Sequence, residues 1–169
     1  MSRLLLVLTA AATACAPIET PMLPGLCGPA VVPMDVVAAP DVDEEAVRAA
    51  AELWGGLLLV DEVPSTRWEA CLWGCMGTAT VYHAELPEGV LGDTFHATDG
   101  AGGVTACEIR LTPWFDADPL VLAHELGHCL GLGHSDDEDS IMHTPVRPWA
   151  APLAGEFERV REGCHDGSH

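Results

Sequence analysis

The stretch from His124 to His134 reads His-Glu-Leu-Gly-His-Cys-Leu-Gly-Leu-Gly-His and decides how the rest of the chain is understood. It follows the pattern H-E-x-x-H-x-x-G-x-x-H, which sets three imidazoles, one carboxylate and one glycine at fixed offsets. On a helix, His124 and His128 lie one turn apart on the same face, where two nitrogens can occupy two corners of a tetrahedral zinc site. The spacing therefore predicts a metal-binding helix.

The remaining positions of this stretch complete the predicted site. Gly131 is expected to end the helix in a left-handed conformation that turns the chain sharply. That turn would bring His134 to the metal as a third ligand and leave a fourth position for water. Glu125, beside the first ligand, can reach this water without binding the metal. The sequence thus predicts one catalytic Zn²⁺ held by His124, His128 and His134.

The residues that follow extend this pattern into a family resemblance. The histidine stretch, followed by Ser140-Ile141-Met142, resembles the metzincin zinc peptidases, in which a methionine in a tight turn lies beneath the metal. Met142 matches that methionine, and Ser135 after the third histidine resembles the matrixin branch. The resemblance implies an α+β, metzincin-like zincin fold: a twisted mixed sheet of about five strands, an active-site helix and a C-terminal helix.

The chain departs from the matrixin pattern just after the methionine. Matrixins usually have an aromatic residue and then proline there, whereas this sequence continues with His143, Thr144 and Pro145. The family pattern therefore does not predict the wall of the specificity pocket.

The N-terminal residues indicate export. Residues 1–14 contain Arg3 and a short apolar run and resemble a cleaved signal peptide. Ala12-Thr13-Ala14-Cys15 also resembles a bacterial lipobox, with Cys15 as the lipidated residue; ordinary cleavage at the same place is the alternative. We expect 15–29 to be a tether and 30–169 the metallopeptidase catalytic domain. The protein would be a cell-envelope or outer-membrane lipoprotein, or secreted, and any membrane contact would be through the lipid anchor.

Cysteine counting supports the lipoprotein interpretation. Without Cys15, six of the seven cysteines remain, and an even number in an exported chain favours disulfides. The expected pairs are Cys71–Cys75, Cys107–Cys129 and Cys27–Cys164, among fifteen connectivities that six cysteines allow. Residues 26–29 faintly resemble a matrixin cysteine switch, but a disulfide is the better interpretation of Cys27.

The chain is strongly acidic, with a net charge of −19 from 26 Asp plus Glu against seven arginines. This balance argues against binding to nucleic acid or to anionic lipid. The acidic run 136–139 could bind Ca²⁺, but its spacing fits no EF-hand, so a solvated loop is favoured. Oligomeric state is left open.

The spacing of hydrophobic residues predicts the other strands and helices. Strands are expected at Val31–Val37, Leu57–Val60, Thr78–Leu86, Val90–Ala97 and Val104–Leu111. One helix is expected to begin within residues 41–45 and to end at Gly55. The metal-binding helix is expected to begin at Pro119, and a last helix to cover Ala154–Glu162. The metzincin resemblance implies that Val90–Ala97 is an antiparallel edge strand that pairs with substrate. Matrixins hold a structural zinc in this region, but His83 and His96 are more simply surface or core histidines.

These features predict a zinc-dependent endopeptidase that acts on protein or peptide substrates, with Glu125 activating a zinc-bound water. The alternative is a catalytically silent, zinc-containing surface lipoprotein that serves as a binding or structural module. Glu125 argues against this alternative, because a binding module does not need a carboxylate at that position.

Overall fold

The structure, a computed structural model, describes residues 28–30, 32–60, 71, 75–113 and 118–162. A five-stranded mixed sheet has the order β2-β1-β3-β5-β4. Its strands are β1 (Met34–Ala38), β2 (Leu58–Val60), β3 (Thr78–His83), β4 (Gly92–Thr98) and β5 (Val104–Leu111). The helices of the described residues are α1 (Glu44–Leu53), α3 (Pro119–Cys129) and α4 (Ala154–Glu162). The predicted α+β class and the sheet of about five strands are confirmed.

The sheet is parallel except at one edge. β2, β1, β3 and β5 run in the same direction, and β4 pairs antiparallel with β5, as expected for the edge strand. Four strands begin or end differently from the prediction, namely β1, β2, β3 and β4. β1 begins at Met34, directly after Pro33, which has no N–H to donate to the ladder.

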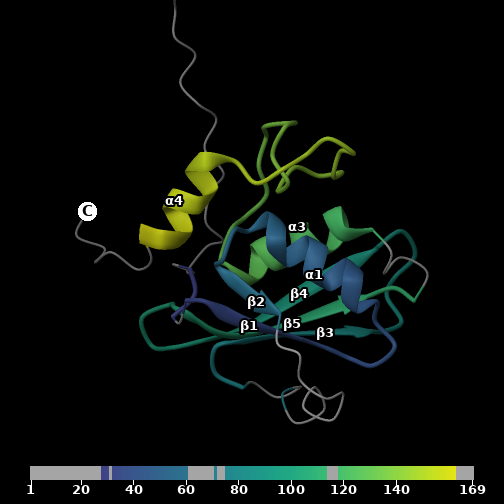
Figure 1. Cartoon of the computed structure of the whole chain (residues 1–169), viewed down its shortest axis with the longest axis horizontal. Helices are drawn as coiled ribbons and strands as arrows, with labels where there is room; N and C mark the ends of the chain where they lie inside the picture. The colour runs from purple at the N-terminus through teal and green to yellow at the C-terminus, as the bar shows by residue number, and fades with distance from the viewer. Residues whose placement is uncertain (1–27, 31, 61–70, 72–74, 114–117, 163–169) are drawn as a thin grey trace, which may run out of the picture.

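Helices α1 and α3 pack against each other and lie over one face of the sheet, as Figure 1 shows. The apolar face of α1 is buried there, and its last turn is followed by Trp54, which is fully buried. Asp43 caps α1 by accepting a hydrogen bond from the Glu45 N–H at 2.9 Å. The resulting core joins both helices to the sheet, and its largest fully buried apolar side chains are Trp54, Met34, Ile109, Leu111, Leu122, Leu126, Leu130, Leu132, Ile141 and Met142.

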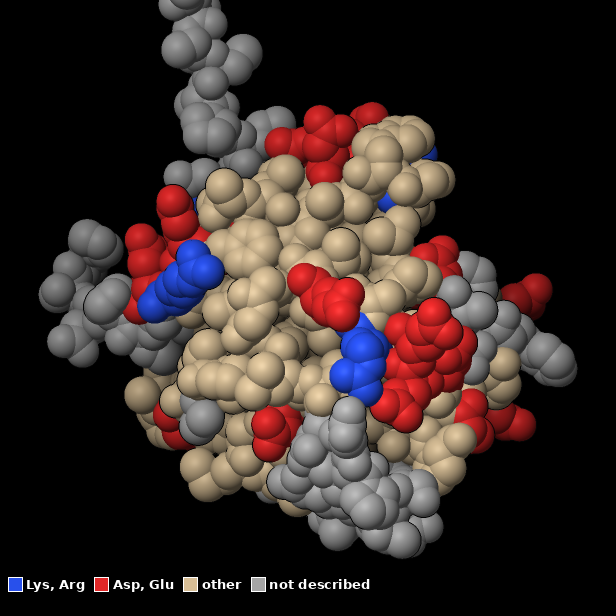
Figure 2. Space-filling view, in the orientation of Figure 1, with Lys and Arg blue, Asp and Glu red and all other residues tan. Residues whose placement is uncertain are grey.

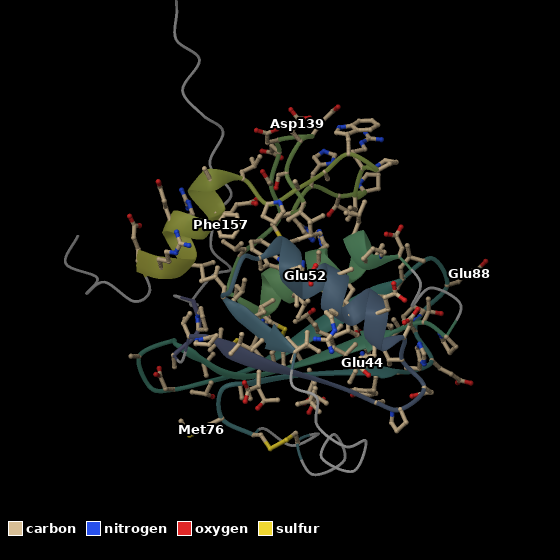
Figure 3. All side chains as sticks on the ribbon, in the orientation of Figure 1. Glu44, Glu52, Met76, Glu88, Asp139 and Phe157 are labelled. Atoms are coloured by element: carbon tan, nitrogen blue, oxygen red, sulfur yellow. A yellow bond between two sulfur atoms is a disulfide. The ribbon has the colours of Figure 1, made fainter. Side chains whose placement is uncertain are left out.

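Helix α4 follows a long loop after α3 and lies beside the core (Figure 1). Val160 is buried, and the Phe157 ring lies 5.7 Å from that of Trp54, so both side chains face the core. Figure 3 shows Phe157 projecting from α4 towards the helices that cover the sheet. The C-terminal helix is thereby packed against the same tryptophan that supports α3.

Two of the three expected disulfides lie in the described residues and are confirmed. Cys107–Cys129 joins β5 to α3, and Cys71–Cys75 closes a short loop. Because the Cys129 sulfur is bonded to Cys107, it is not a free thiol that could bind a metal. The predictions for the signal peptide, Cys15 and the Cys27–Cys164 pair fall outside the described residues. Within the described residues, no helix is both long and apolar enough to cross a bilayer.

Candidate metal centre

The first part of the site is a capped helix that ends in a sharp turn. Asp118 accepts a hydrogen bond from the Leu120 N–H at 2.9 Å, and Pro119 occupies the first turn, where its missing N–H costs nothing. The helix ends at Cys129, and Gly131 has a φ of +87°, a conformation that favours glycine. The chain then reverses, which brings His134 back beside the helix.

Three imidazoles converge at this turn. One ligand nitrogen from each of His124, His128 and His134 lies within 4.8 Å of the other two. The Nε2 atoms of His124 and His128 are 3.1 Å apart. Two nitrogens bound to one tetrahedral zinc at ordinary bond lengths are separated by about 3.3 Å. The spacing therefore fits joint coordination of one zinc ion.

Backbone carbonyls orient two of these rings. The Nδ1 atom of His124 lies 2.8 Å from the Ile141 carbonyl oxygen, and that of His128 lies 2.7 Å from the Leu132 carbonyl oxygen. A carbonyl oxygen only accepts, so each Nδ1 must donate and each Nε2 presents a lone pair to the shared centre. This tautomer is the one that a zinc ligand requires.

Burial keeps the same two rings neutral. Removal from water lowers the pKa of His124, and it lowers the pKa of His128 to about 4, because the charged imidazolium is disfavoured by desolvation. The Ile141 and Leu132 carbonyls oppose this effect without overcoming it. Both nitrogens are thus available to a metal at neutral pH, since a protonated imidazole cannot coordinate one.

Glu125 lies on the same helix and is almost fully buried, with 6% of its surface exposed. Burial raises the pKa of its carboxyl to about 6, and the Thr94 hydroxyl, which donates to Oε2 at 2.6 Å, opposes that rise. The negative charge of Asp93 raises the pKa further. The hydrogen bond from Thr94 holds one carboxylate oxygen against β4 and leaves Oε1 for another partner.

Close approach of β4 to α3 depends on Gly92. A Cβ atom at this position would lie 2.9 Å from Glu125 Cγ and 3.1 Å from Oε1. Any side chain there would push the carboxylate away from its present position.

The methionine of the predicted turn, Met142, lies against helix α3. It is fully buried, and Gly127 lies so close that a Cβ there would overlap Met142 Sδ and come within 2.8 Å of Trp54 Cζ2. Trp54 Nε1 also donates to the Ala123 carbonyl at 2.9 Å. Methionine and tryptophan therefore support α3 from below.

Helix α4 fixes the turn that carries this methionine. Ser140 Oγ donates to Glu156 Oε1 at 2.5 Å and accepts from the Met142 N–H at 2.9 Å. Glu156 Oε2 accepts from the Leu153 N–H at 2.7 Å, and only 1% of this residue is exposed. A buried carboxylate with these partners ties the C-terminal helix to the methionine turn.

Comparisons with known proteins show what the chain is similar to. The Peptidase M10 (Matrixin) family model matches residues 82–153, which include β4, β5, α3 and the methionine turn. Metalloendoproteinase 1 from Glycine max is 30% identical over 124 residues, which cover 64% of this chain and 40% of that protein. Over these residues the chain resembles the matrixin branch of the metzincins. It spans 40% of the length of the soybean protein.

The structure brings His124, His128 and His134 together. Glu125 lies on the same helix, and Met142 is buried against Gly127. A matrixin implies zinc, and the three histidines supply the donors for it. In the part of the chain that is described, only these three form a cluster of metal-ligating side chains.

The two histidines considered for a second zinc are used elsewhere. His83 Nδ1 lies 3.1 Å from Asp41 Oδ2, and His96 Nε2 lies 2.8 Å from the His128 carbonyl oxygen. The second contact joins β4 to α3. The acidic loop has Asp136, Glu138 and Asp139 exposed (Figure 3 labels Asp139 at its tip), and calcium binding there stays a prediction.

Sequence reasoning missed the residues that support the site from other elements, namely Trp54, Gly92, Thr94, Ser140 and Glu156. Their contacts with other elements join positions between 16 and 73 residues apart, so no local spacing reveals them. One weak signal was available. Gly92 and Thr94 are two positions apart and so share one face of a strand that was already expected to lie along the cleft.

Proposed function

We propose that the protein is a zinc-dependent endopeptidase in which Glu125 is the general base. The observation that carries this proposal is the position of a buried, hydrogen-bonded carboxylate directly beside three converging imidazoles. A purely structural zinc site usually has four protein ligands. The described residues supply three, and the neighbouring Cys129 is bonded to Cys107.

Zinc in this site would polarise a peptide carbonyl and lower the pKa of a coordinated water. The chain's own residues move the proton and hold the reacting groups in position. Ionised Glu125 accepts a proton from the attacking water through Oε1 and then donates it to the departing amine. Thr94 holds Oε2, so the carboxylate need not reorient during the transfer, and His124 and His128 stay neutral because they are buried.

The edge strand β4 is the proposed binding surface for substrate backbone. It pairs with β5 on one side, and within the described residues no strand pairs with its other side. An extended peptide can add to such an edge through main-chain hydrogen bonds. Because Thr94 of this strand contacts Glu125, a peptide on the edge would lie next to the general base.

We also propose that the protein acts outside the cytoplasm, with Cys15 as a lipid anchor. The Cys107–Cys129 and Cys71–Cys75 disulfides support export, since such bonds persist in oxidising compartments. Mass spectrometry of the mature N-terminus tests the anchor: a diacylglyceryl-modified Cys15 is expected, and an unmodified N-terminus would contradict it.

The peptidase proposal is tested with Glu125→Gln, which removes the base but keeps the size of the side chain. We expect unchanged zinc content and a loss of peptide hydrolysis of about 10²–10⁴-fold. Glu52→Gln, at an exposed position of α1 (labelled in Figure 3), is the matched control and should keep full activity. Undiminished hydrolysis by Glu125→Gln would rule out Glu125 as the base.

A further inference from the structure

A cleft of about 640 Å³ extends from the metal centre along α3. One end is formed by His124, Glu125 and His134, and the cleft continues past Leu120 and Val121 towards the start of the helix. The opposite side is the segment 144–148, which follows the methionine turn. The side chain of a substrate residue next to the scissile bond would enter this cleft.

The cleft lining includes one arginine, Arg147, and no other Lys or Arg among the described residues. Its Nε atom is buried and has no hydrogen-bond partner in the described part of the chain. Other arginines are engaged: Arg48 pairs with Glu44, and Arg110 pairs with Asp93. A buried donor without a partner is unfavourable, and a ligand in the cleft can accept from it once the side chain turns to expose this atom.

The surroundings of Arg147 make a carboxylate the best acceptor. Nε and an adjacent nitrogen of a guanidinium form a fork that matches the two oxygens of a carboxylate. Leu120, Val121 and Val146 also line the cleft and can cover the methylene groups of a glutamate side chain.

One acidic group in the lining could oppose such a ligand. Asp118 accepts the Leu120 N–H as the cap of α3, and the positive end of the helix dipole partly compensates its charge. Glu125 lies at the metal end of the cleft and is held by Thr94. Among the described residues, Arg147 is therefore the charged side chain of the lining that has a nitrogen, Nε, without a hydrogen-bond partner.

We propose that Arg147 selects substrates with a glutamate next to the scissile bond by binding its carboxylate in this cleft. This inference rests on the proposed peptidase function and adds a substrate class to it. The protein is acidic overall (Figure 2 shows red side chains outnumbering blue ones on this face), so acidic peptides are repelled at a distance. The selectivity must come from local contact with Arg147.

The test uses zinc-loaded Glu125→Gln protein, which should bind peptides without cleaving them. Capped heptapeptides of Gly and Ala with a central Glu, Gln or Lys are titrated calorimetrically at one ionic strength. We expect the Glu peptide to bind about tenfold more tightly than the Gln peptide, as for one charge-assisted contact. Equal binding of these two peptides would overturn the proposal, and so would preferential binding of the Lys peptide, which would assign the selectivity to Asp118.

Two variants in the same background locate the effect. Arg147→Gln should abolish the preference for Glu, whereas Arg48→Gln, which makes the same change in net charge on the surface of α1, should preserve it. A preference that persists in Arg147→Gln would also overturn the proposal. Because binding is read without turnover, a wild-type protein that cleaves no peptide would contradict the peptidase proposal while leaving this comparison readable.

Discussion

The floor of the cleft, formed by α3 and residues 131–142, is mostly buried, whereas its walls, residues 89–98 and 144–148, are mostly half-buried or exposed. In the floor, backbone carbonyls orient His124 and His128, and Met142 is fully buried against Gly127. In the walls, the Thr94 side chain donates to Glu125, and Arg147 lines the cleft. The floor can thus hold a metal rigidly while the walls determine what binds above it.

This difference predicts that substitutions in the floor change stability and metal binding, and that substitutions in the walls change turnover or selectivity. Buried positions have little room to relax, so a changed volume is costly there. Exposed positions away from special contacts usually change stability by less than about 0.5 kcal/mol. Four variants test this division, from the largest expected effect to the smallest.

Gly127→Ala should destabilise the floor of the cleft. The new methyl group would overlap Met142 Sδ and Trp54 Cζ2, and we expect a net loss of about 3 kcal/mol in the free energy of unfolding despite the better helix propensity of alanine. Urea denaturation measures this loss. Gly155→Ala is the control, because a Cβ in α4 meets nothing within 4 Å, and it should be neutral or slightly stabilising. If Gly127→Ala is as stable as the wild type, Met142 and Trp54 can move to make room for the methyl group.

Glu125→Gln should stabilise the zinc-free protein at neutral pH. The pKa of the Glu125 carboxyl is about 6 in the folded protein, against 4.5 without burial, so ionisation disfavours the folded state. The penalty is absent below pH 4.5, grows as the pH rises to 6 and is complete above it, at about 2 kcal/mol.

Urea unfolding in the presence of a chelator checks this at two pH values. Zinc-free Glu125→Gln should exceed the wild type by that amount at pH 7 and match it at pH 4. An equal difference at both pH values would show that the carboxyl is not held in a desolvated position.

Thr94→Val tests how the wall acts on the floor. Loss of the hydroxyl frees Glu125 Oε2, and we expect kcat to fall about tenfold with little change in KM, because the base is no longer fixed. Thr94→Ser keeps the hydroxyl and should restore most of the activity. A larger change in KM than in kcat would indicate that Thr94 contacts substrate instead.

Trp149→Ala should have the smallest effect. The side chain is 63% exposed just beyond the wall segment, so the free energy of unfolding should change by less than about 0.5 kcal/mol. Thermal and urea unfolding can both measure it. A loss above 1 kcal/mol would show that the region beside this wall also supports the core.

The same division explains what could be predicted from the sequence. The ligands, Glu125 and Gly131 lie within eleven residues, where helix geometry converts spacing directly into position. Met142 was predicted only through the family resemblance, because its contact with Gly127 depends on a loop. The edge position of β4 was likewise implied by the family and is confirmed by its antiparallel pairing with β5.

The supporting contacts could not be predicted because they join distant elements. Trp54 donates to Ala123 across 69 positions, and Thr94 donates to Glu125 across 31. Each depends on how helices and strands pack, which periodicity does not specify. The cleft wall at 144–148 could not be predicted for another reason, because its sequence departs from the matrixin pattern.

The most direct test of the account is zinc content measured together with hydrolysis of a denatured protein by the full chain, with and without a chelator. The account predicts one zinc per chain and cleavage that the chelator abolishes and added zinc restores. A folded protein that binds no zinc, or one whose cleavage survives complete removal of the metal, would contradict it.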